Sequence, residues 1–363
     1  MTVPAPEDGR IRIAVAGLGW AGRSIWLPRL RDNPAYRLIA AVDPDPASRE
    51  AAADTVAGLS TMASLDELDP AAVDLAVVAV PNHLHAAAGS ALLRRGIPVF
   101  LEKPVCLSEP EVDQLAGAER AGGAVLLAGS AGRYRADVRA LLDVVRGLGT
   151  IRHIDLAWVR SRGIPRAGGW FTRREMSGGG ALVDLGWHLL DTLVPVLGPV
   201  GFPHVVGTVS DDFLHDDAWR AAWRADEQGG AGGDVEDTAR GFLVTDDGVS
   251  VALRASWASH QPQDTTTIAV EASGGVATLR CTFGFSPNRP GAATLTVTRN
   301  GVTEEVPLPD EPIGSEYDRQ LAELPALLAA PHARGQAAEE ARRTIGVIER
   351  FYDSARTRRK VHR

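Results

Sequence analysis

Three glycines close to the N-terminus constrain the fold more than any other feature of the sequence. Gly17, Gly19 and Gly22 form a G-x-G-x-x-G pattern, which alone is weak evidence in a chain with 38 glycines. Here the apolar run IRIAVAG leads directly into the glycines, and a plausible helix begins near Ala21. The first glycine can make a tight turn, the second can admit a pyrophosphate to the backbone, and the third can let the helix pack on the strand. The stretch therefore predicts a dinucleotide-binding turn, with a purely structural glycine turn as the alternative.

Short apolar runs alternate with helical segments through the first third of the chain. The runs are rich in β-branched and aliphatic residues, as strands buried on both faces must be, and they cover 10–17, 36–42, 74–80, 98–102 and 124–129. Alanine- and leucine-rich segments suited to crossover helices lie at 47–57, 84–95 and 109–121. This order predicts an α/β fold that begins with a Rossmann-type, doubly wound parallel sheet over residues 1–130.

The pattern of the sequence changes in the middle of the chain. Apolar and polar side chains alternate over 249–257, 266–272 and 293–299, which indicates a sheet with one buried face. Residues suited to two-residue hairpin turns fall between such runs, at Asp247-Gly248, Gly274-Gly275 and Asn300-Gly301. Residues 131–363 are therefore expected to form an α+β domain for substrate binding and oligomerisation, with a large, mainly antiparallel open sheet. An amphipathic helix over 336–356 ends this region and could pack back on the first domain.

An acidic residue at the end of the second apolar run bears on the choice of cofactor. Asp43 follows Gly22 by 21 residues. A carboxylate at this place accepts hydrogen bonds from the adenosine ribose 2′-hydroxyl and repels a 2′-phosphate. The sequence thus predicts NAD as the cofactor, with NADP less favourable. An aspartate that only serves the DPDP turn is the alternative.

The composition argues against several classes of partner. The formal net charge is -8, so a nucleic-acid binder or an anionic-membrane binder, each of which needs a basic face, is not expected. The two cysteines form no C-x-x-C pair, and the sequence has no segment typical of a signal peptide or a membrane span, so we expect a cytoplasmic protein. His83 and His85 form an H-x-H pattern without a third ligand nearby, so no metal site is expected.

Further motifs carry a family resemblance. LEKPV (101–105) follows the fourth predicted strand, and GGGALVDLGWHLLDTL (178–193) comes much later. Together with the glycine turn, VAVPNHLHAAA (78–88) and AGRYRADVRALL (131–142), they resemble the glucose–fructose oxidoreductase, inositol dehydrogenase and MocA family over most of the chain. The resemblance implies a nicotinamide-dependent oxidoreductase that acts on a polyol, sugar or cyclitol and assembles as a homodimer or homotetramer.

The resemblance and the glycine turn together predict which residues form the cofactor and substrate sites. Cofactor contacts are expected from Gly17, Gly19, Trp20, Ala21, Gly22, Asp43, Pro81, Asn82, His85, Glu102 and Lys103. Catalytic roles are expected for Lys103, Asp184 and His188. Tyr134 and Trp170 are expected to bind the substrate together with Asp184 and His188, and ordinary packing is the alternative for the two aromatic residues.

The chemistry of alcohol oxidation supports the catalytic set. Removal of hydride from a secondary alcohol requires a base for the hydroxyl proton, and a histidine such as His188 suits this task near neutral pH. Asp184, four residues earlier on the predicted helix, would lie on the same face and orient the imidazole or bind the substrate. Lys103, just beyond the end of a parallel strand, would stabilise a developing alkoxide. A surface helix pair and a solvated lysine are the structural alternatives.

A local excess of acids suggests the charge of the substrate. Acids outnumber arginines between 205 and 240: Asp211, Asp212, Asp216, Asp217, Asp226, Glu227, Asp234, Glu236 and Asp237 against Arg220, Arg224 and Arg240. If this segment covers the pocket, its field would attract a cationic amino sugar or aminocyclitol rather than a neutral hexose or a sugar nucleotide. Trp219 and Trp223 could face the same cation. A solvated acidic loop is the alternative, and another group favours an anionic substrate: Arg160, Arg162, Arg166, Arg173 and Arg174.

Two further functions are compatible with these motifs. An NAD-dependent glycoside hydrolase oxidises its sugar only transiently and would accumulate no NADH. A dinucleotide sensor would keep the fold without the chemistry, and the presence of Lys103, Asp184 and His188 together argues against it.

Overall fold

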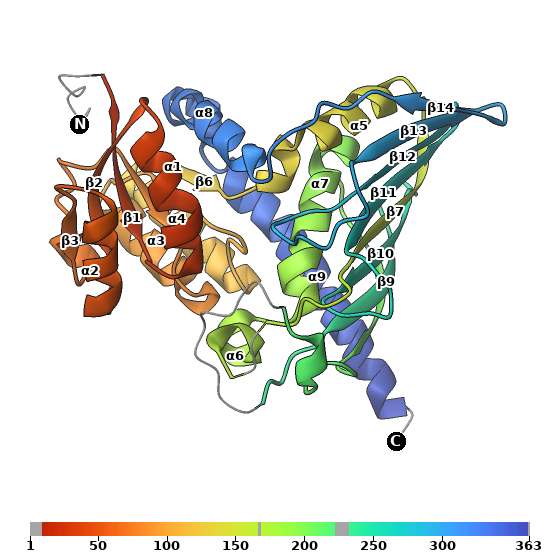
Figure 1. Cartoon of the computed structure of the whole chain (residues 1–363), viewed down its shortest axis with the longest axis horizontal. Helices are drawn as coiled ribbons and strands as arrows, with labels where there is room; N and C mark the ends of the chain where they lie inside the picture. Colours follow the sequence, from red (N-terminus) through yellow and green to blue (C-terminus); the bar gives the residue numbers. More distant parts are fainter. Residues whose placement is uncertain (1–8, 166–167, 222–231, 362–363) are drawn as a thin grey trace. The chain divides into compact units, whose positions relative to one another are not determined.

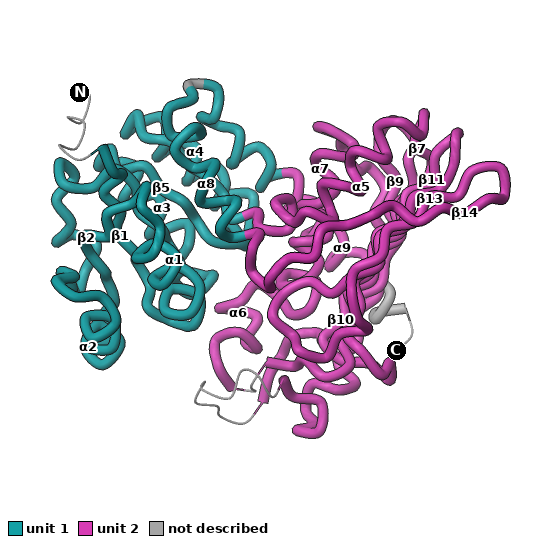
Figure 2. Tube along the Cα trace, turned by 45° about the horizontal axis from the view of Figure 1, so that its top comes forward, with its two compact units in different colours: residues 1–129, 317–342 teal, residues 130–316, 343–363 magenta. Residues whose placement is uncertain are grey.

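The computed structural model describes residues 9–165, 168–221 and 232–361 (Figure 1). The chain divides into two compact units (Figure 2). The first comprises residues 1–129 and 317–342, and the second comprises 130–316 and 343–363. The division expected from the sequence, 1–130 and 131–363, is continuous, whereas the first unit of the structure also includes a late segment of the chain.

A parallel sheet forms the centre of the first unit. Its six strands lie in the order β3-β2-β1-β4-β5-β6, and every neighbouring pair is parallel. Strand order reverses between β1 and β4, which is the place where such sheets bind dinucleotides. The predicted doubly wound fold is confirmed. The strands are β1 (Ile11–Ala16), β2 (Tyr36–Val42), β3 (Ser60–Met62), β4 (Leu75–Val78), β5 (Val99–Leu101) and β6 (Leu126–Ala128). Only β3, a short and mostly exposed edge strand, lacks the apolar run that would predict it.

Helices connect these strands as the sequence predicts. They are α1 (Leu27–Asp32), α2 (Pro46–Thr55), α3 (His85–Arg94) and α4 (Glu109–Gly122). A late helix, α8 (Ser315–Ala329), packs on the same unit, because the Tyr36 hydroxyl donates a hydrogen bond to the Leu321 carbonyl and Gln320 Nε2 donates one of 3.1 Å to the Ala128 carbonyl. These contacts explain why the first unit is discontinuous in sequence.

A large open sheet forms the second unit. Its eight strands lie in the order β14-β13-β12-β11-β7-β10-β9-β8, with β7 and β10 parallel and the other neighbours antiparallel. The mainly antiparallel sheet is therefore confirmed. The strands are β7 (Ile151–Val159), β8 (His204–Ser210), β9 (Thr238–Val244), β10 (Ser250–Ser256), β11 (Thr265–Ala272), β12 (Gly275–Cys281), β13 (Thr294–Arg299) and β14 (Val302–Val306). Asn300 and Gly301 both have positive φ, 53° and 79°, as the predicted hairpin turn requires.

Helices cover one face of this sheet, which buries alternate strand residues. Figure 1 shows three helices on this side of the sheet: α5 (Ala136–Arg146), α7 (Trp187–Leu197) and α9 (Gln336–Val361). The Phe351 ring of α9 occupies the space that side chains at Gly207 and Gly241 would need. Two glycines on neighbouring strands therefore let the last helix pack close to the sheet.

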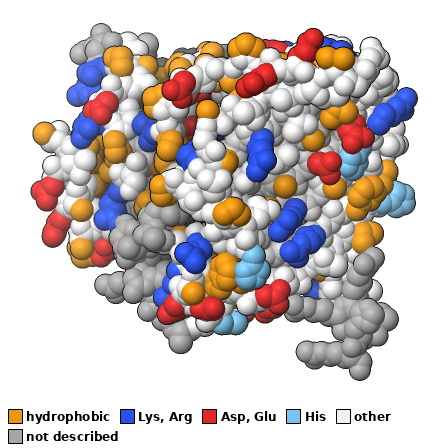
Figure 3. All heavy atoms as spheres, turned by 45° about the vertical axis from the view of Figure 1, so that its right-hand side comes forward, with side chains coloured by type: hydrophobic (Ala, Val, Ile, Leu, Met, Phe, Trp, Pro, Cys, Tyr) orange, Lys and Arg blue, Asp and Glu red, His pale blue; other side chains and the backbone are white. Residues whose placement is uncertain are grey.

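The other face of the sheet has no helix on it among the described residues. Arg254 of β10 lies directly opposite Arg240 of β9, and Phe242 beside them is 49% exposed. Figure 3, in which the right-hand side of Figure 1 comes forward, shows separate charged groups and scattered hydrophobic side chains with no broad apolar patch. The face is therefore mixed in character rather than broadly apolar.

One helical segment, Arg174–Leu197, is long and apolar enough to cross a membrane by length and composition, with a mean hydropathy of 1.3. In the structure 72% of its apolar window is buried within the protein. The segment is therefore accounted for as a core helix of the second unit, and it contains both Asp184 and His188.

Candidate active site

The glycine turn after β1 has a separate local reason for each of its three glycines. Gly17 has a φ of 92°, and a Cβ there would overlap the carbonyl group of Ala79. A Cβ at Gly22 would collide with the Gly17 carbonyl oxygen. By contrast, nothing lies within 4 Å of a Cβ placed at Gly19. Gly19 is thus the open position at which a ligand can approach the backbone, and Trp20 and Ala21 lie half-buried beside it.

Asp43 connects this turn to the second strand. Its Oδ2 accepts a hydrogen bond of 2.7 Å from the Leu18 N–H, and its Oδ1 accepts one of 2.9 Å from the Asp45 N–H. Each carboxylate oxygen retains a further lone pair for a ribose hydroxyl. Arg49 Nη1 donates to the Asp43 carbonyl oxygen at 2.7 Å, so a cation also lies close by. The open glycine, the helix that follows and this carboxylate fit a nicotinamide dinucleotide.

His85 is an interior residue rather than an exposed ligand. Its ring is 1% exposed, with Nδ1 2.6 Å from the Pro104 carbonyl oxygen and Nε2 2.8 Å from the Val80 carbonyl oxygen. Burial lowers the pKa of His85 to about 4 and favours the neutral ring, which has one N–H to donate. His85 therefore joins the end of β4 to the turn that follows Lys103.

The neighbours of His85 provide no metal site in the described part of the chain. Pro81 and the buried Asn82 begin the short turn before it, and His83 is half-buried. No group of three His, Cys, Asp or Glu side chains in the described residues could hold a metal ion.

The Glu102-Lys103 pair follows β5 at the carboxyl end of the parallel sheet. Glu102 Oε1 accepts a hydrogen bond of 2.9 Å from Trp26 Nε1, and Oε2 accepts one of 2.9 Å from the Lys103 N–H. Burial raises the pKa of Glu102. Glu102 thus binds the protein's own groups through both oxygens and holds the backbone of the half-exposed Lys103.

Asp184 and His188 lie on one continuous helix of the second unit. Asp184 belongs to a π-helical turn, Leu182–Gly186, and His188 lies in the first turn of α7. Trp257 Nε1 donates a hydrogen bond of 2.9 Å to Asp184 Oδ2, and the His188 ring centroid is 5.6 Å from that of Trp158. The predicted helix is confirmed, and a π turn replaces its regular α-helical hydrogen bonding at Asp184. Such turns are frequent at functional sites. That the two side chains share one face stays a prediction.

The start of this helix is held by Glu236, a buried residue that precedes β9. Glu236 Oε1 accepts hydrogen bonds of 3.0 Å from the N–H groups of Gly180 and Leu182 and one of 2.7 Å from the Tyr352 hydroxyl. Its Oε2 lies 3.2 Å from Arg174 Nη2. One carboxylate therefore satisfies orphan N–H groups at the start of the helix and joins it to α9.

The two predicted aromatic residues also lie in the second unit. Trp170 packs on Phe171 with centroids 4.9 Å apart, and Phe171 lies 6.0 Å from Trp257. Trp170 is thereby linked through aromatic contacts to the residue that holds Asp184. Tyr134 is half-buried, with the Arg139 guanidinium 5.1 Å from its ring centroid.

The structure groups the predicted residues by unit. The expected cofactor residues and Lys103 all belong to the first unit, and Tyr134, Trp170, Asp184 and His188 belong to the second. A site that combines Lys103 with His188 stays a prediction. Sequence reasoning missed Trp158, Trp257 and Tyr352, and it counted Glu236 only as part of the local acidic excess. Trp257 had a signal as the last residue of the alternating run 249–257.

The acidic residues between 205 and 240 differ in their exposure to solvent. Asp211, Asp212, Asp216 and Asp217 are exposed, whereas Glu236 and Asp237 are buried. Glu236 serves the helix start, and Asp237 Oδ2 accepts a hydrogen bond of 2.6 Å from the Phe213 N–H. The expected exposed acidic field is therefore smaller than the composition indicates. Arg166, Trp223, Arg224, Asp226 and Glu227 lie outside the described residues.

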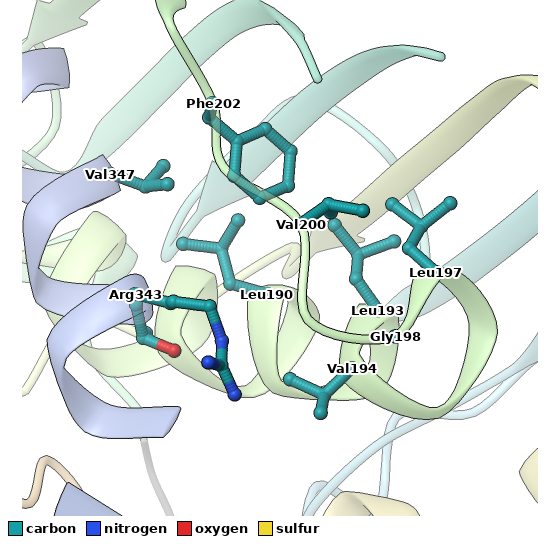
Figure 4. A pocket seen from close by; sticks show the side chains of 10 residues that line it. Leu190, Leu193, Val194, Leu197, Gly198, Val200, Phe202, Arg343 and Val347 are labelled. Atoms are coloured by element: carbon teal, nitrogen blue, oxygen red, sulfur yellow. The ribbon is translucent and has the colours of Figure 1, made fainter. Parts of the chain in front are cut away.

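A separate hollow lies at the far end of α7 (Figure 4). It has a volume of about 330 Å³, open mouth included, and Leu190, Leu193, Val347 and other apolar residues line it, with the Arg343 side chain at one side. Although Leu190 is only two residues from His188, the lining of the hollow includes neither Asp184 nor His188, nor their ring partners Trp257 and Trp158.

Comparisons with known proteins agree with this arrangement. Residues 11–130 match an oxidoreductase family with an NAD-binding Rossmann fold, and residues 137–280 match the GFO/IDH/MocA C-terminal domain. A protein of Amycolatopsis mediterranei (strain S699), named as the candidate oxidoreductase subunit of UDP-kanosamine synthase, is 60% identical over 345 residues, which cover 95% of this chain and 96% of the relative. D-glucoside 3-dehydrogenase of Escherichia coli (strain K12) is 28% identical over 264 residues, 70% of this chain and 72% of the relative.

A solved structure shows the same fold. GenD2 from gentamicin A biosynthesis, in complex with NAD, superposes with a TM-score of 0.71 at 24% identity and covers 95% of this chain and 94% of its own. The family resemblance seen in the motifs is thus confirmed at the level of whole domains. This chain belongs to the GFO/IDH/MocA family and is an NAD(P)-dependent oxidoreductase that acts on sugar hydroxyl groups.

Proposed function

We propose that this protein oxidises the C3 hydroxyl of a UDP-hexose to a ketone with NAD. The observation that carries the proposal is the nearly full-length, 60% identical relative named for UDP-kanosamine synthesis. Kanosamine is a 3-amino sugar, and nitrogen is introduced at a sugar carbon through its carbonyl form, which an oxidoreductase supplies. The name of the E. coli relative, a 3-dehydrogenase, supports the same position on the ring. A partner enzyme that transfers an amino group would use the ketone.

The predicted catalytic residues of both units support the chemistry of this reaction. His188 would accept the hydroxyl proton while the C3–H bond breaks with its electron pair and the carbonyl forms. Asp184, held by Trp257, would bind the substrate or orient the imidazole. Lys103, which Glu102 and His85 hold by its backbone turn, would stabilise the developing alkoxide. The bound dinucleotide supplies the hydride acceptor.

The position of Asp43 supports NAD over NADP. Its carboxylate lies at the end of β2 beside the glycine turn, where a 2′-phosphate would meet a negative charge. Arg49 is the competing feature, because its guanidinium lies next to Asp43 and would suit a phosphate.

The outer face of the second sheet supports a homo-oligomer. Arg240 and Arg254 lie opposite one another on this face, and Asp155 lies on β7 of the same face. A second copy that places carboxylates against the arginine pair would relieve its repulsion. A cytoplasmic location and a separate amino-transferring partner complete the proposal.

Substrate oxidation with a position-specific label tests the function. The purified protein is incubated with NAD and UDP-glucose carrying deuterium at C3, with unlabelled UDP-glucose, neutral glucosides and amino sugars in parallel. Formation of NADH from the UDP-sugar, with deuterium in the reduced cofactor, is the expected result. Preference for an amino sugar would favour the cationic substrate instead, and product without net NADH would favour a hydrolase.

Two variants test the proposed roles in the same assay. His188→Ala and Lys103→Ala are each expected to lower kcat by about 10²–10⁴-fold, as removal of acid–base or electrostatic groups does. Their affinity for NAD should change by only a small factor. His332→Ala, a change at an exposed histidine of the first unit, is the matched control. Unchanged turnover in both site variants would remove the proposed roles.

A further inference from the structure

Three aromatic rings form a cluster on loops of the second unit. Phe213 and Trp219 have centroids 4.5 Å apart, and His260 lies 5.5 Å from Phe213 and 5.0 Å from Trp219. Phe213 and Trp219 are half-buried and His260 is exposed. The cluster is held in place by backbone pairing, because the Ile164 N–H donates to the Trp219 carbonyl oxygen at 3.2 Å. It offers flat apolar surface that solvent can reach.

A chain of contacts connects this aromatic cluster to His188. The His188 ring lies 5.6 Å from Trp158, and the Arg160 guanidinium lies 5.0 Å from the same indole. Ser259 Oγ donates a hydrogen bond of 2.9 Å to the Arg160 carbonyl oxygen, and His260 of the cluster is the next residue. The residues that join His188 to the cluster are therefore Trp158, Arg160 and Ser259.

The charges along this route follow a definite order. In this series of contacts the buried Arg160 lies between His188 and the aromatic cluster, and the exposed Arg162 pairs with Ala258, two residues before His260. Guanidinium groups pair well with phosphate oxygens. Asp216 and Asp217 are exposed near Trp219; Asp216 Oδ1 accepts a hydrogen bond of 2.9 Å from the Ala218 N–H, and Asp217 pairs with Arg220. The remaining lone pairs of these carboxylates suit the donors of a ribose or the imide N–H of a uracil. A sugar, a diphosphate, a ribose and a base occur in the same order in a pyrimidine nucleoside diphosphate sugar.

We infer that the aromatic cluster is the base subsite, and that Arg162 together with Arg160 forms the diphosphate subsite, of a uridine diphosphate sugar. This inference rests on the proposed function, because it places the sugar of that nucleotide at His188. Under this inference the carboxylates beside Trp219 bind neutral hydroxyl and imide groups, and they do not select the cationic sugar that was expected from the sequence. The affinity for the nucleotide then comes from stacking and from arginine contacts remote from the reacting carbon.

Binding of UDP and of uridine separates the two subsites. Affinities are measured by calorimetry for the wild type, Trp219→Ala, Trp219→Phe and Arg162→Ala. Trp219→Ala is expected to weaken both ligands at least tenfold, since base stacking on an aromatic ring contributes on this scale, whereas Trp219→Phe retains most of the affinity. Arg162→Ala is expected to weaken UDP at least tenfold and to leave uridine nearly unchanged. Arg37→Ala, at an exposed arginine on β2, is the matched control.

Kinetics distinguish failure of the subsite from failure of the proposed function. If the function is right, Trp219→Ala raises KM for the UDP-sugar with little change in kcat, and it leaves turnover of a simple glucoside unchanged. Oxidation of the UDP-sugar by the wild type with an unchanged KM in Trp219→Ala would overturn the subsite alone. A wild type that neither binds UDP nor oxidises the UDP-sugar would overturn both. Thermal melts of each variant establish that the fold is retained, and a raised KM for an amino sugar alone would assign the cluster to a cation.

Discussion

Trp257 donates its indole N–H to Oδ2 of Asp184 at 2.9 Å, and its ring is fully buried. The Trp257 N–H of the main chain also donates to the Asp237 carbonyl oxygen at 2.8 Å. One tryptophan thus joins the end of β10, the start of β9 and the carboxylate on the helix that bears His188.

Loss of this hydrogen bond should lower turnover. Trp257→Phe keeps a large ring but removes the donor, and hydrogen bonds to charged groups contribute about 1.5–3 kcal/mol. We expect kcat to fall by about 10–100-fold while the affinity for the dinucleotide stays the same. Steady-state kinetics and cofactor titration measure both. Equal kcat in the variant and the wild type would show that Asp184 needs no such support.

The Glu236 network should determine the stability of the second unit. Glu236→Ala leaves the Gly180 and Leu182 N–H groups, the Tyr352 hydroxyl and the Arg174 charge without this carboxylate. Unsatisfied buried groups cost about 1–3 kcal/mol each, so the free energy of unfolding should fall by about 3 kcal/mol or more. Urea denaturation measures the loss.

Tyr352→Phe provides the milder comparison in this network. It removes one hydrogen bond to Glu236 and should cost only about 1 kcal/mol. Glu271→Ala, at an exposed position on β11, is the matched acid control. A loss of stability in Tyr352→Phe as large as that in Glu236→Ala would contradict the assignment of the carboxylate as the centre of the network.

The charge of Asp43 should set the cofactor preference. Asp43→Asn keeps an oxygen that can accept the Leu18 N–H but removes the negative charge. We expect NAD to bind more weakly, because the charge-assisted contact with the ribose is lost, and NADP to bind more tightly, because the repulsion of the 2′-phosphate is removed. The ratio of the two affinities should fall by about tenfold. Fluorescence titration with both cofactors measures the ratio. Tighter binding of NADP by the wild type would instead assign the adjacent Arg49 to a 2′-phosphate.

His85 should make the stability of the protein depend on pH. Its pKa is lowered to about 4 by burial, whereas an unfolded histidine has a pKa of about 6.5. As the pH falls, the unfolded chain therefore binds a proton at His85 before the folded protein does. The contribution of His85 to the free energy of unfolding is present above about pH 6.5 and is lost as the pH falls toward 4. Relative to His85→Gln, the wild type should lose about 3 kcal/mol more of its unfolding free energy over that range.

Denaturation at several pH values, with His332→Ala as the control, measures the effect. Nitrogen NMR of the imidazole provides an independent readout of the protonation state. A doubly protonated His85 at pH 7, donating to both the Pro104 and the Val80 carbonyl oxygens, would reverse the sign of the prediction.

The arginine pair on the outer sheet face should matter for assembly. Burial lowers the pKa of Arg254, and Arg240 beside it lowers it further. Arg254→Glu should convert the repulsion into attraction within one copy and shift an oligomer toward monomer, while Arg37→Glu in the first unit should have no effect. Light scattering measures the mass. A wild type that is monomeric at working concentrations would exclude the proposed interface.

Local patterns in the sequence were sufficient for most strands and helices of the first unit, but not for β3 or α8. The apolar run 36–42 is β2 residue for residue, and Gly17, Gly19 and Gly22 meet three different steric requirements within one turn. Burial of a whole strand leaves a periodic signal, and the glycine turn leaves a fixed spacing, although the carbonyl that excludes a side chain at Gly17 belongs to the distant Ala79. The sequence also determined that Asp184 and His188 share a helix.

Contacts between distant segments were decided only by the tertiary structure. Glu236 and Tyr352 are separated by 116 positions, and Asp184 and Trp257 by 73, yet each pair shares a hydrogen bond. No local periodicity predicts which distant donor meets a given carboxylate, because that choice follows from the packing of helices on the sheet. The inclusion of α8 in the first unit follows from contacts between distant segments in the same way. The sequence by itself thus determined which chemical groups the protein has, and the packed fold decided which of them are held beside one another.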